Sequence, residues 1–357
     1  MPLQYDQIRQ QVNRILVIKL RAIGDVILAT PVIENLRRAF PDAQIDFLTE
    51  PPAAPLLKHH PDLDDVLVFE RNYVDSKSGL AWLRENLAFF RELYRRKYDL
   101  VFDLFGNPRS AQFAWATRAR YRIGYAFRGR QYAYNYRIPP RGDRVHEVQF
   151  NLDALQALGI PVRTRDPRIE LSDIEEAFAE RYWQASGLTG SLVIGMNSSG
   201  GWYTKRWPLH RFAELGDRLT EQLSCRILLL WGPGELQDVQ EIARSMKHQP
   251  IIAPQTDLLQ LAAILKRLHL LISNDSGPMH LAAAMGTPVV AIFGPTRPDL
   301  QGPWGQGHRV ARLEGLSCLG CNQTTCHIQT LDCMNRLEVD PVLQNAVEVL
   351  ELQGLNS

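Results

Sequence analysis

The chain has 357 residues, 45% of them hydrophobic and 22% charged, which is typical of a globular protein long enough for two ordinary domains. The formal net charge of +1 argues against a general nucleic-acid binder but leaves room for a local basic face. No apolar run reaches the roughly 18 residues of a membrane helix, and the polar start MPLQYDQIRQQVNR lacks a signal-peptide core, so we expect a cytoplasmic location.

The first half alternates predicted strands with predicted helices. The apolar run at residues 14–20 predicts a buried strand, and a sharp turn leads from it into an amphipathic helix at 26–40. Further strands are predicted at 44–49, 65–69 and 98–104, and further helices at 79–97 and 146–158. This alternation is typical of an α/β domain with a parallel sheet.

Asp25 occupies the turn after the first predicted strand, where an N-cap residue would sit. A helix cap is the simpler interpretation of this carboxylate. The functional interpretation is a carboxylate exposed at the carboxyl edge of the sheet, where open α/β sheets bind ligands. Gly24 precedes it and would allow a neighbouring chain or ligand to approach the backbone closely.

Residues 105–145 are rich in arginine and tyrosine and contain a single acidic residue, Asp143. Such a stretch is compatible with RNA binding and also with an anionic sugar, phosphate or lipid head group, because arginine pairs with carboxylate and phosphate. A solvated basic face with tyrosines packed on a sheet edge is the alternative without a ligand. Because the total charge is near zero, we favour a local anion site.

The second half repeats the α/β pattern after a polar, proline-bearing boundary near residue 165. Strands are predicted at 191–196 and 225–231, and helices at 172–186, 208–223, 235–247, 257–266 and 341–352. A small-residue loop that includes Ser198 and Ser199 follows the first of these strands, and Lys205 lies shortly downstream. Such a loop can hold phosphates, although it is not a P-loop. Two doubly wound domains facing each other across a cleft are expected.

Residues 268–296 predict a strand, a helix and a second strand. The helix begins near Ser276 and Gly277, so its free N–H groups would lie at the carboxyl end of a parallel strand and favour a phosphate. An ordinary crossover in which Asp275 only caps the helix is the alternative. His280 lies one turn into the helix.

Cys318, Cys321, Cys326 and Cys333 lie close together in the sequence near the C-terminus. Four thiolates at this spacing could bind one structural zinc or iron ion. Reduced surface thiols are the alternative.

Four blocks occur in order along almost the whole chain: RILVIKLRAIGDVILATPVIENLRRAFPDAQIDFLT, NSSGGWYTKRWPLHRFAEL, NDSGPMHLAAAMGTPVVAIFGPT and CLGCNQTTCHIQTLDCM. With them the sequence resembles glycosyltransferase family 9, the ADP-heptose:lipopolysaccharide heptosyltransferases. The resemblance implies a GT-B fold, with an acceptor-binding Rossmann-like domain at 1–165 and a nucleotide-sugar-binding one at 166–357. It also implies an inverting transfer of heptose from ADP-heptose, with no cofactor for catalysis.

The resemblance assigns residues to roles. Asp25 would be the general base, and Lys205 would bind the donor phosphates and assist catalysis. The donor-binding set would be Gly24, Ser198, Ser199, Lys205, Asp275, Ser276, Gly277 and His280. We expect Asp275 to cap the helix or to reach a sugar or ribose hydroxyl, since it would repel phosphates. An acidic acceptor such as Kdo or a phosphorylated core sugar would meet Arg109, Arg118, Arg120 and Arg122.

Several functions stay open at this point. The acceptor could be the lipopolysaccharide inner core, another glycan or a protein side chain. A nucleotide-sugar 2-epimerase would use the same architecture, and an RNA-binding or assembly protein would use the arginine-rich stretch and the cysteines. The family resemblance favours a transferase that binds no nucleic acid. A lipid-linked acceptor is compatible with peripheral contact at the inner membrane, but no amphipathic basic helix in the sequence forces that conclusion.

Overall fold

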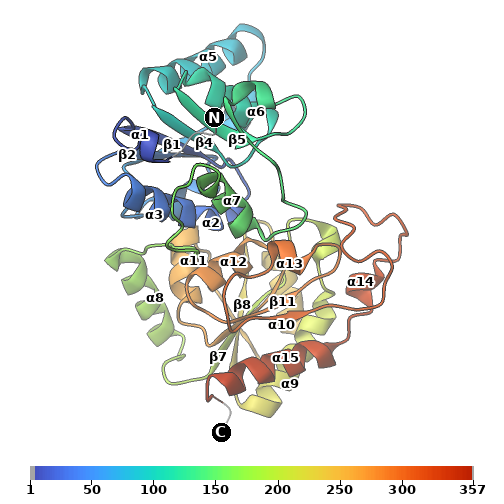
Figure 1. Ribbon diagram of the computed structural model, residues 1–357. Helices are drawn as coiled ribbons and strands as arrows, with labels where there is room; N and C mark the ends of the chain where they lie inside the picture. Colours follow the sequence, from blue (N-terminus) through green and yellow to red (C-terminus); the bar gives the residue numbers. More distant parts are fainter. Residues whose placement is uncertain (1–4, 356–357) are drawn as a thin grey trace. The chain divides into compact units, whose positions relative to one another are not determined.

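The computed structural model describes residues 5–355, which divide into two compact units (Figure 1). Unit 1 ends at Glu170 and unit 2 begins at Leu171, whereas the sequence suggested a boundary at 165. The intervening residues remain with unit 1 because its first long helix holds their backbone. The Arg163 N–H donates to Asn35 Oδ1 at 2.6 Å, and the Arg168 N–H donates to Thr30 Oγ1 at 2.9 Å.

Unit 1 contains a six-stranded parallel sheet in the order β3-β2-β1-β4-β5-β6. Its central strands are short apolar runs buried on both faces, as parallel strands covered by helices must be. The strands are β1 (Arg14–Ile18), β2 (Gln44–Thr49), β3 (Asp65–Val68), β4 (Leu100–Asp103), β5 (Tyr121–Tyr125) and β6 (Tyr136–Ile138).

The predicted helices at 79–97 and 146–158 are present as α5 and α7, whereas α1, α4 and α6 were not predicted. The predicted helix at 26–40 is two helices, because Pro31 stands in the first turn of the second and cannot donate a backbone hydrogen bond to the turn before it. The helices are α1 (Tyr5–Ile8), α2 (Ile23–Ile27), α3 (Thr30–Ala39), α4 (Arg71–Asp75), α5 (Gly79–Arg95), α6 (Pro108–Ala116) and α7 (Glu147–Gln156), with 3-10 turns η1 (Ala54–Leu57) and η2 (Gln131–Ala133).

The arginine- and tyrosine-rich segment contains α6, β5 and β6. Two of its tyrosines, Tyr125 and Tyr134, are completely buried. The Tyr134 hydroxyl donates to Asp103 Oδ2 at 2.6 Å. Burial raises the pKa of both tyrosines, which therefore stay neutral donors. These tyrosines thus support the sheet rather than a ligand surface.

Unit 2 contains a second six-stranded parallel sheet, in the order β12-β11-β10-β7-β8-β9. Its strands are β7 (Val193–Asn197), β8 (Arg226–Leu230), β9 (Ile251–Ile252), β10 (Leu270–Asn274), β11 (Val289–Ile292) and β12 (Arg309–Ala311). Its helices are α8 (Asp173–Ala185), η3 (Tyr203–Lys205), α9 (Leu209–Leu223), α10 (Leu236–Ser245), α11 (Leu258–Leu265), α12 (Gly277–Ala284), α13 (Pro298–Gln301), α14 (Asp332–Asn335) and α15 (Val339–Leu352).

Both sheets have the strand order of the doubly wound nucleotide-binding fold, 3-2-1-4-5-6 within each unit. In such a sheet the first strand lies next to the fourth, and from this pair the strands are added outward in opposite directions. Ligands bind at the carboxyl ends of the strands at this switch point. The switch points are β1/β4 in unit 1 and β7/β10 in unit 2. No helix among residues 5–355 is long and apolar enough to cross a membrane.

Candidate functional site

Asp25 lies in α2, directly after the carboxyl end of β1. Its carboxylate accepts a hydrogen bond from the Ala22 N–H, with 2.9 Å between Ala22 N and Asp25 Oδ2. The N-cap of α2 is Ala22, so the predicted cap position of Asp25 was wrong, because the helix begins earlier than the apolar spacing indicates. The buried Gly24 belongs to the same turn. The carboxylate thus stands at the carboxyl edge of the sheet, beside the switch point of unit 1.

Lys19 follows β1 and is buried, although sequence reasoning did not single it out. Its Nζ lies 2.6 Å from Glu147 Oε1, 3.2 Å from Asn151 Oδ1 and 3.1 Å from the Leu104 carbonyl oxygen. Burial acts to lower the pKa of Lys19, but nearby carboxylates, led by Glu147 and Asp25, raise it above its ordinary value. The ammonium group therefore places a permanent positive charge behind the turn that carries Asp25. The sequence feature that could have identified Lys19 is a lysine placed directly after a buried apolar strand.

Replacing Lys19 with methionine is expected to lower the free energy of unfolding by about 3 kcal/mol, because it leaves the partly buried Glu147 carboxylate without its cation. Urea denaturation followed by circular dichroism measures the loss. The double variant Lys19→Met/Glu147→Leu removes both charges and should recover much of the stability. A single variant as stable as the wild type would show that the ion pair is not structural.

A cavity of about 400 Å³ opens at the carboxyl ends of β1, β2 and β3. Ala22, the hydrogen-bond donor to Asp25, belongs to its wall. Glu50 and Arg71 also line it, with 3.3 Å between Arg71 Nε and Glu50 Oε2, and the Glu50 side chain is only 7% exposed. Within the described residues the buried Arg71 Nε has no hydrogen-bond partner. The cavity thus has a buried carboxylate and the guanidinium paired with it in its wall, next to the turn of Asp25.

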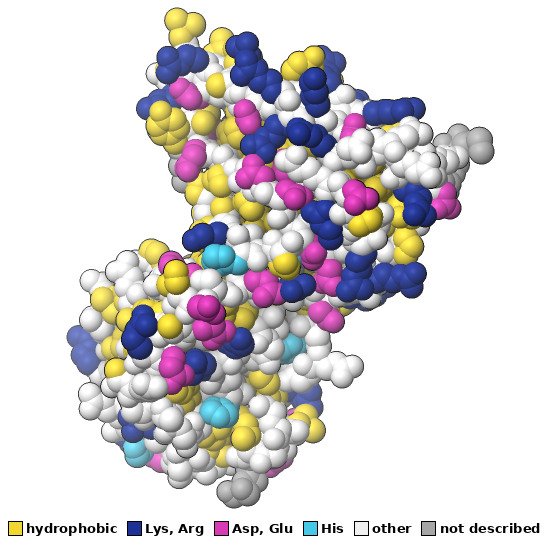
Figure 2. All heavy atoms as spheres, turned by 90° about the vertical axis from the view of Figure 1, so that its left-hand side faces the viewer, with side chains coloured by type: hydrophobic (Ala, Val, Ile, Leu, Met, Phe, Trp, Pro, Cys, Tyr) yellow, Lys and Arg dark blue, Asp and Glu magenta, His cyan; other side chains and the backbone are white. Residues whose placement is uncertain are grey.

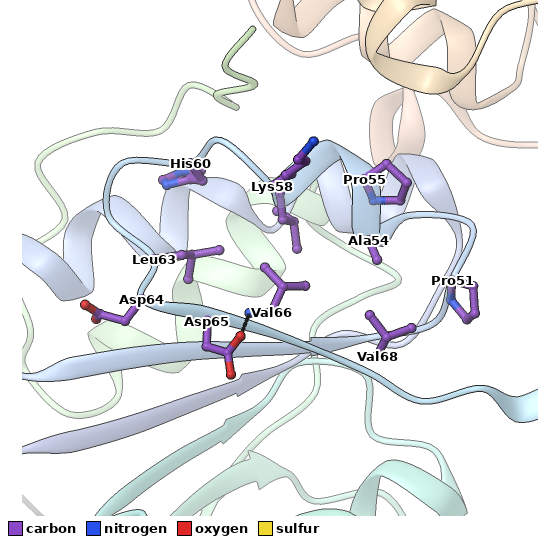
Figure 3. A pocket seen from close by; sticks show the side chains of 11 residues that line it. Pro51, Ala54, Pro55, Lys58, His60, Leu63, Asp64, Asp65, Val66 and Val68 are labelled. Carbon is purple, nitrogen blue, oxygen red and sulfur yellow. Dashed lines mark hydrogen bonds between the residues drawn. The ribbon is translucent and has the colours of Figure 1, made fainter. Parts of the chain in front are cut away.

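A larger cavity of about 680 Å³ lies along β3, the edge strand of the same sheet (Figure 3). Val66 and Val68 rise from β3 toward η1, while Asp65 is directed to the opposite side of the strand (Figure 3). The polar side chains that line this larger cavity include Lys58 and His60, and burial lowers the pKa of His60. None of the residues predicted from sequence to be functional lines this cavity, which follows the edge of the sheet instead of its switch point.

Of the four arginines predicted to bind the acceptor, Arg109 lies at the carboxyl edge of the sheet, in the first turn of α6 after β4. Its Nη2 is 3.0 Å from Asp75 Oδ1, and its guanidinium stacks 5.1 Å from the centre of the Phe69 ring. Arg109 is therefore on the same edge as Asp25, although its charge is already paired.

The other three, Arg118, Arg120 and Arg122, surround the amino end of β5, at the opposite edge of the parallel sheet. Arg118 stacks on Trp115, Arg120 donates to a glutamine side chain, and Arg122 donates to two backbone carbonyls. The structure thus does not bring them together with Asp25. On the face shown in Figure 2, Lys and Arg side chains of unit 1 are interspersed with acidic ones, so the visible positive charge is locally balanced.

In unit 2, two asparagines at strand ends connect the predicted donor loop to the predicted phosphate helix. Asn197 ends β7 and donates through Nδ2 to Ser276 Oγ at 2.9 Å, while its Oδ1 accepts from Ser199 Oγ at 2.7 Å. Asn274 ends β10 and donates to the Ser198 carbonyl oxygen at 2.7 Å. The small-residue loop is therefore held against the start of α12. The sequence pattern marked the loop but not the asparagines that hold it.

Lys205 and Asp275 form a close ion pair, with 2.6 Å between Lys205 Nζ and Asp275 Oδ2. Thr296 Oγ1 donates to the same carboxylate oxygen at 2.6 Å, and the Lys205 ammonium lies 4.5 Å from the centre of the Trp202 ring. The N-cap of α12 is Ser276, so of the two roles expected for Asp275 the helix cap is wrong, and contact with a sugar or ribose hydroxyl stays a prediction. Its carboxylate is used to position Lys205.

The start of α12 lies beside this pair. The first N–H groups of the helix, those of Gly277 and Met279, have no intrahelical acceptor. Ser276 does not cap them either, because its side chain makes no capping hydrogen bond. His280 is buried one turn further on. A lysine ammonium next to a helix N-terminus at a switch point is an arrangement suited to a diphosphate.

The four clustered cysteines line one small cavity together with His327, as their spacing suggested. The surrounding backbone N–H groups, led by that of Leu331, lower the pKa of Cys326, and burial raises the pKa of Cys333 to about 11. All four thiols are free. Within residues 5–355 no three or more His, Cys, Asp or Glu side chains are arranged to hold a metal ion, so the predicted structural zinc or iron is not supported.

The family model of glycosyltransferase family 9 (heptosyltransferase) matches residues 86–331. Lipopolysaccharide heptosyltransferase 3 of Escherichia coli K12 is 29% identical over 297 residues, covering 80% of this chain and 83% of that protein. The solved glycosyl transferase family 9 structure from Veillonella parvula DSM 2008 is 27% identical, with a TM-score of 0.86 and 99% of both chains covered.

Escherichia coli heptosyltransferase WaaC, solved with ADP-2-deoxy-2-fluoro heptose, has a TM-score of 0.72 at 22% identity and covers 94% of this chain and 99% of its own. The similarity to heptosyltransferases of known structure confirms the predicted GT-B fold class. The family model spans well over half of the chain. The chain therefore belongs to glycosyltransferase family 9, the heptosyltransferases, and is a glycosyltransferase.

Proposed function

We propose that this enzyme transfers a heptosyl group from ADP-heptose to a sugar of the lipopolysaccharide inner core, with inversion at the anomeric carbon and without a catalytic metal. The observation that carries the proposal is the Lys205–Asp275 pair next to the start of α12, which is suited to the diphosphate of a nucleotide-sugar. The names of several similar proteins, among them lipopolysaccharide heptosyltransferases 1 and 3, support the choice of heptose and of a lipopolysaccharide acceptor.

Unit 2 would bind the donor. Lys205 and the N–H groups at the start of α12 face the diphosphate in this proposal, and the Ser198 hydroxyl adds a hydrogen-bond donor. Ser199 and Ser276 contribute by fixing the loop and the helix start, because their hydroxyls donate to Asn197 Oδ1 and to the Asn274 carbonyl oxygen. Asp275 does not meet the phosphates, since it would repel them, and instead fixes the Lys205 ammonium. As the bond between the anomeric carbon and the phosphate oxygen breaks, ADP leaves with the electron pair, and these positive groups stabilise its growing charge.

Unit 1 would bind the acceptor. The acceptor hydroxyl oxygen attacks the anomeric carbon, and Asp25 takes the hydroxyl proton as general base. The cavity lined by Ala22, Glu50 and Arg71 would hold the acceptor sugar, with Glu50 accepting from sugar hydroxyls and Arg71 donating to sugar oxygens. Arg109 lies at the same edge and is the one predicted arginine that we retain as an acceptor contact.

Incubation with ADP-heptose and a deacylated inner-core oligosaccharide tests the proposal. We expect one equivalent of ADP for each heptose added to the oligosaccharide, measured by mass spectrometry, and no comparable transfer from UDP-sugars. Donor incubated alone is the control. Conversion of the donor without an acceptor would point to an epimerase, and transfer to a peptide but not to the oligosaccharide would overturn the proposed acceptor.

A further inference from the structure

Helix α5 of unit 1 (Gly79–Arg95), labelled in Figure 1, carries an exposed apolar stripe, here called the outer stripe. It consists of Leu80, Leu83, Leu87 and Tyr94. The spacings of three, four and seven residues place these side chains on one side of the helix. They are well exposed, with Leu80 at 85% and Leu87 at 54%. Scattered exposed leucines are ordinary, but an aligned row on one helix requires an explanation.

The fold itself does not need the outer stripe. Side chains next to the stripe anchor the helix: the buried Leu93, together with Phe89 and Phe90, whose rings contact the ring of Phe113. Phe89 also packs edge-to-face on Phe69 at 5.0 Å between ring centres. Phe90, three residues after Leu87, marks the boundary between the side of α5 that packs on the core of unit 1 and the outer stripe, which stays exposed.

A row of three arginines runs directly beside the outer stripe, here called the arginine row: Arg84, Arg91 and Arg95. Arg84 follows Leu80 by four residues and Arg91 follows Leu87 by four, so each lies next to a leucine on the helix surface. All three are exposed. Among the described residues, Arg91 and Arg95 have no acidic ion-pair partner, while Arg84 pairs with the adjacent Glu85 at 3.2 Å.

We propose that the outer stripe and arginine row of α5 dock unit 1 on the surface of an anionic lipid bilayer. A helix with an apolar stripe beside a cationic row lies in the interface, with its apolar side chains among the acyl chains and its cations at the lipid phosphates. The unpaired charges of Arg91 and Arg95 favour anionic lipid over an apolar protein partner, which would leave them without counter-charges. Just before α5 in the chain, the exposed Tyr73 ring is contacted by the half-buried Lys77 ammonium, 4.4 Å from the ring centre. The sequence pattern alone did not require membrane contact, and the exposed side of α5 is the structural observation that supports it here.

Flotation of the full chain with vesicles tests the proposal. Wild type should bind vesicles of phosphatidylcholine with about 30% phosphatidylglycerol, bind pure phosphatidylcholine weakly, and lose binding as salt is raised. The variant Leu80→Ser/Leu87→Ser should bind the anionic vesicles about tenfold more weakly or worse, because it removes apolar side chains that insert. The matched control Ile174→Ser/Leu352→Ser removes residues that are 76% and 70% exposed on unit 2 and should leave binding unchanged.

A charge variant separates the two contributions. Arg91→Glu/Arg95→Glu should abolish the preference for anionic vesicles while leaving the apolar stripe intact. With a deacylated, water-soluble acceptor the leucine variant should retain wild-type turnover, so vesicle binding and the proposed transferase function can fail independently. Equal flotation of wild type and leucine variant, or self-association through the stripe without vesicle binding, would overturn the proposal.

Discussion

Asp25→Asn is expected to lower kcat for heptosyl transfer by about 10²–10⁴ while leaving the Kd of ADP-heptose unchanged. Asparagine has nearly the same shape and its Oδ1 can still accept the Ala22 N–H, so the turn should keep its conformation. It cannot take the proton of the acceptor hydroxyl, which is the role proposed for the carboxylate. Steady-state kinetics give kcat, and calorimetry with ADP-heptose gives Kd.

A matched control is available at the other end of the same strand. The Asp99 carboxylate accepts the N–H groups of Asn13 and Arg14 at 2.8 and 3.0 Å, at the amino edge of the sheet. Asp99→Asn removes a carboxylate with the same kind of backbone contact and should leave kcat unchanged. If both variants lose activity and stability alike, Asp25 is a structural residue. If Asp25→Asn turns over normally, another group is the base.

Lys205→Ala is expected to weaken binding of ADP and ADP-heptose by roughly tenfold to a hundredfold, because a charge-assisted contact to the diphosphate is lost. Binding of adenosine, which has no phosphate, should hardly change. Calorimetry with the three ligands separates these outcomes. The turnover number should fall as well, since the same ammonium would stabilise the charge that develops on departing ADP.

The ion pair with Asp275 supplies the control for this variant. Among the described residues, the buried Asp275 carboxylate would then keep only the Thr296 hydroxyl, so Lys205→Ala should also lower Tm, and adding Asp275→Asn should restore it. Lys266→Ala removes another lysine of unit 2, paired with Glu176 at 2.6 Å on the surface, and should leave ADP binding intact. An equal loss of adenosine affinity in Lys205→Ala would show that the site had lost its structure.

The sequence predicted the strands of both sheet centres well, because a parallel strand covered on both faces must be a continuous apolar run. Residues 191–196 and 225–231, for example, became β7 and β8. It missed β5, an inner strand whose sequence YRIGY contains Arg122 and Gly124 and is not a continuous apolar run. It also missed β6, β9 and β12, which are short edge strands that lack that signal as well. Edge strands are defined by the neighbour they pair with, and a local pattern does not show that neighbour.

The predicted site divides in the same way. Lys205, Asp275 and Ser276 come together at one strand end, and Asp25 stands at the carboxyl edge of unit 1. The four arginines were grouped because they are near one another in sequence. Arg109 follows β4 at the carboxyl edge of the sheet, where Asp25 lies, but Arg122 stands at the amino end of β5, at the opposite edge. Closeness in sequence therefore did not mean closeness in space.

By itself, the sequence determined the α/β class, the positions of the buried strands, the residues at their ends and the resemblance to a heptosyltransferase family, since these depend on local apolar patterns and ordered motifs. Only the tertiary structure decided that Asp275 holds Lys205, that Lys19 is buried with Glu147, and that α5 exposes an apolar stripe. The first two depend on contacts between segments far apart in the chain. The third depends on which side of the helix the core covers. A local sequence pattern contains neither piece of information, because both arise when the chain packs.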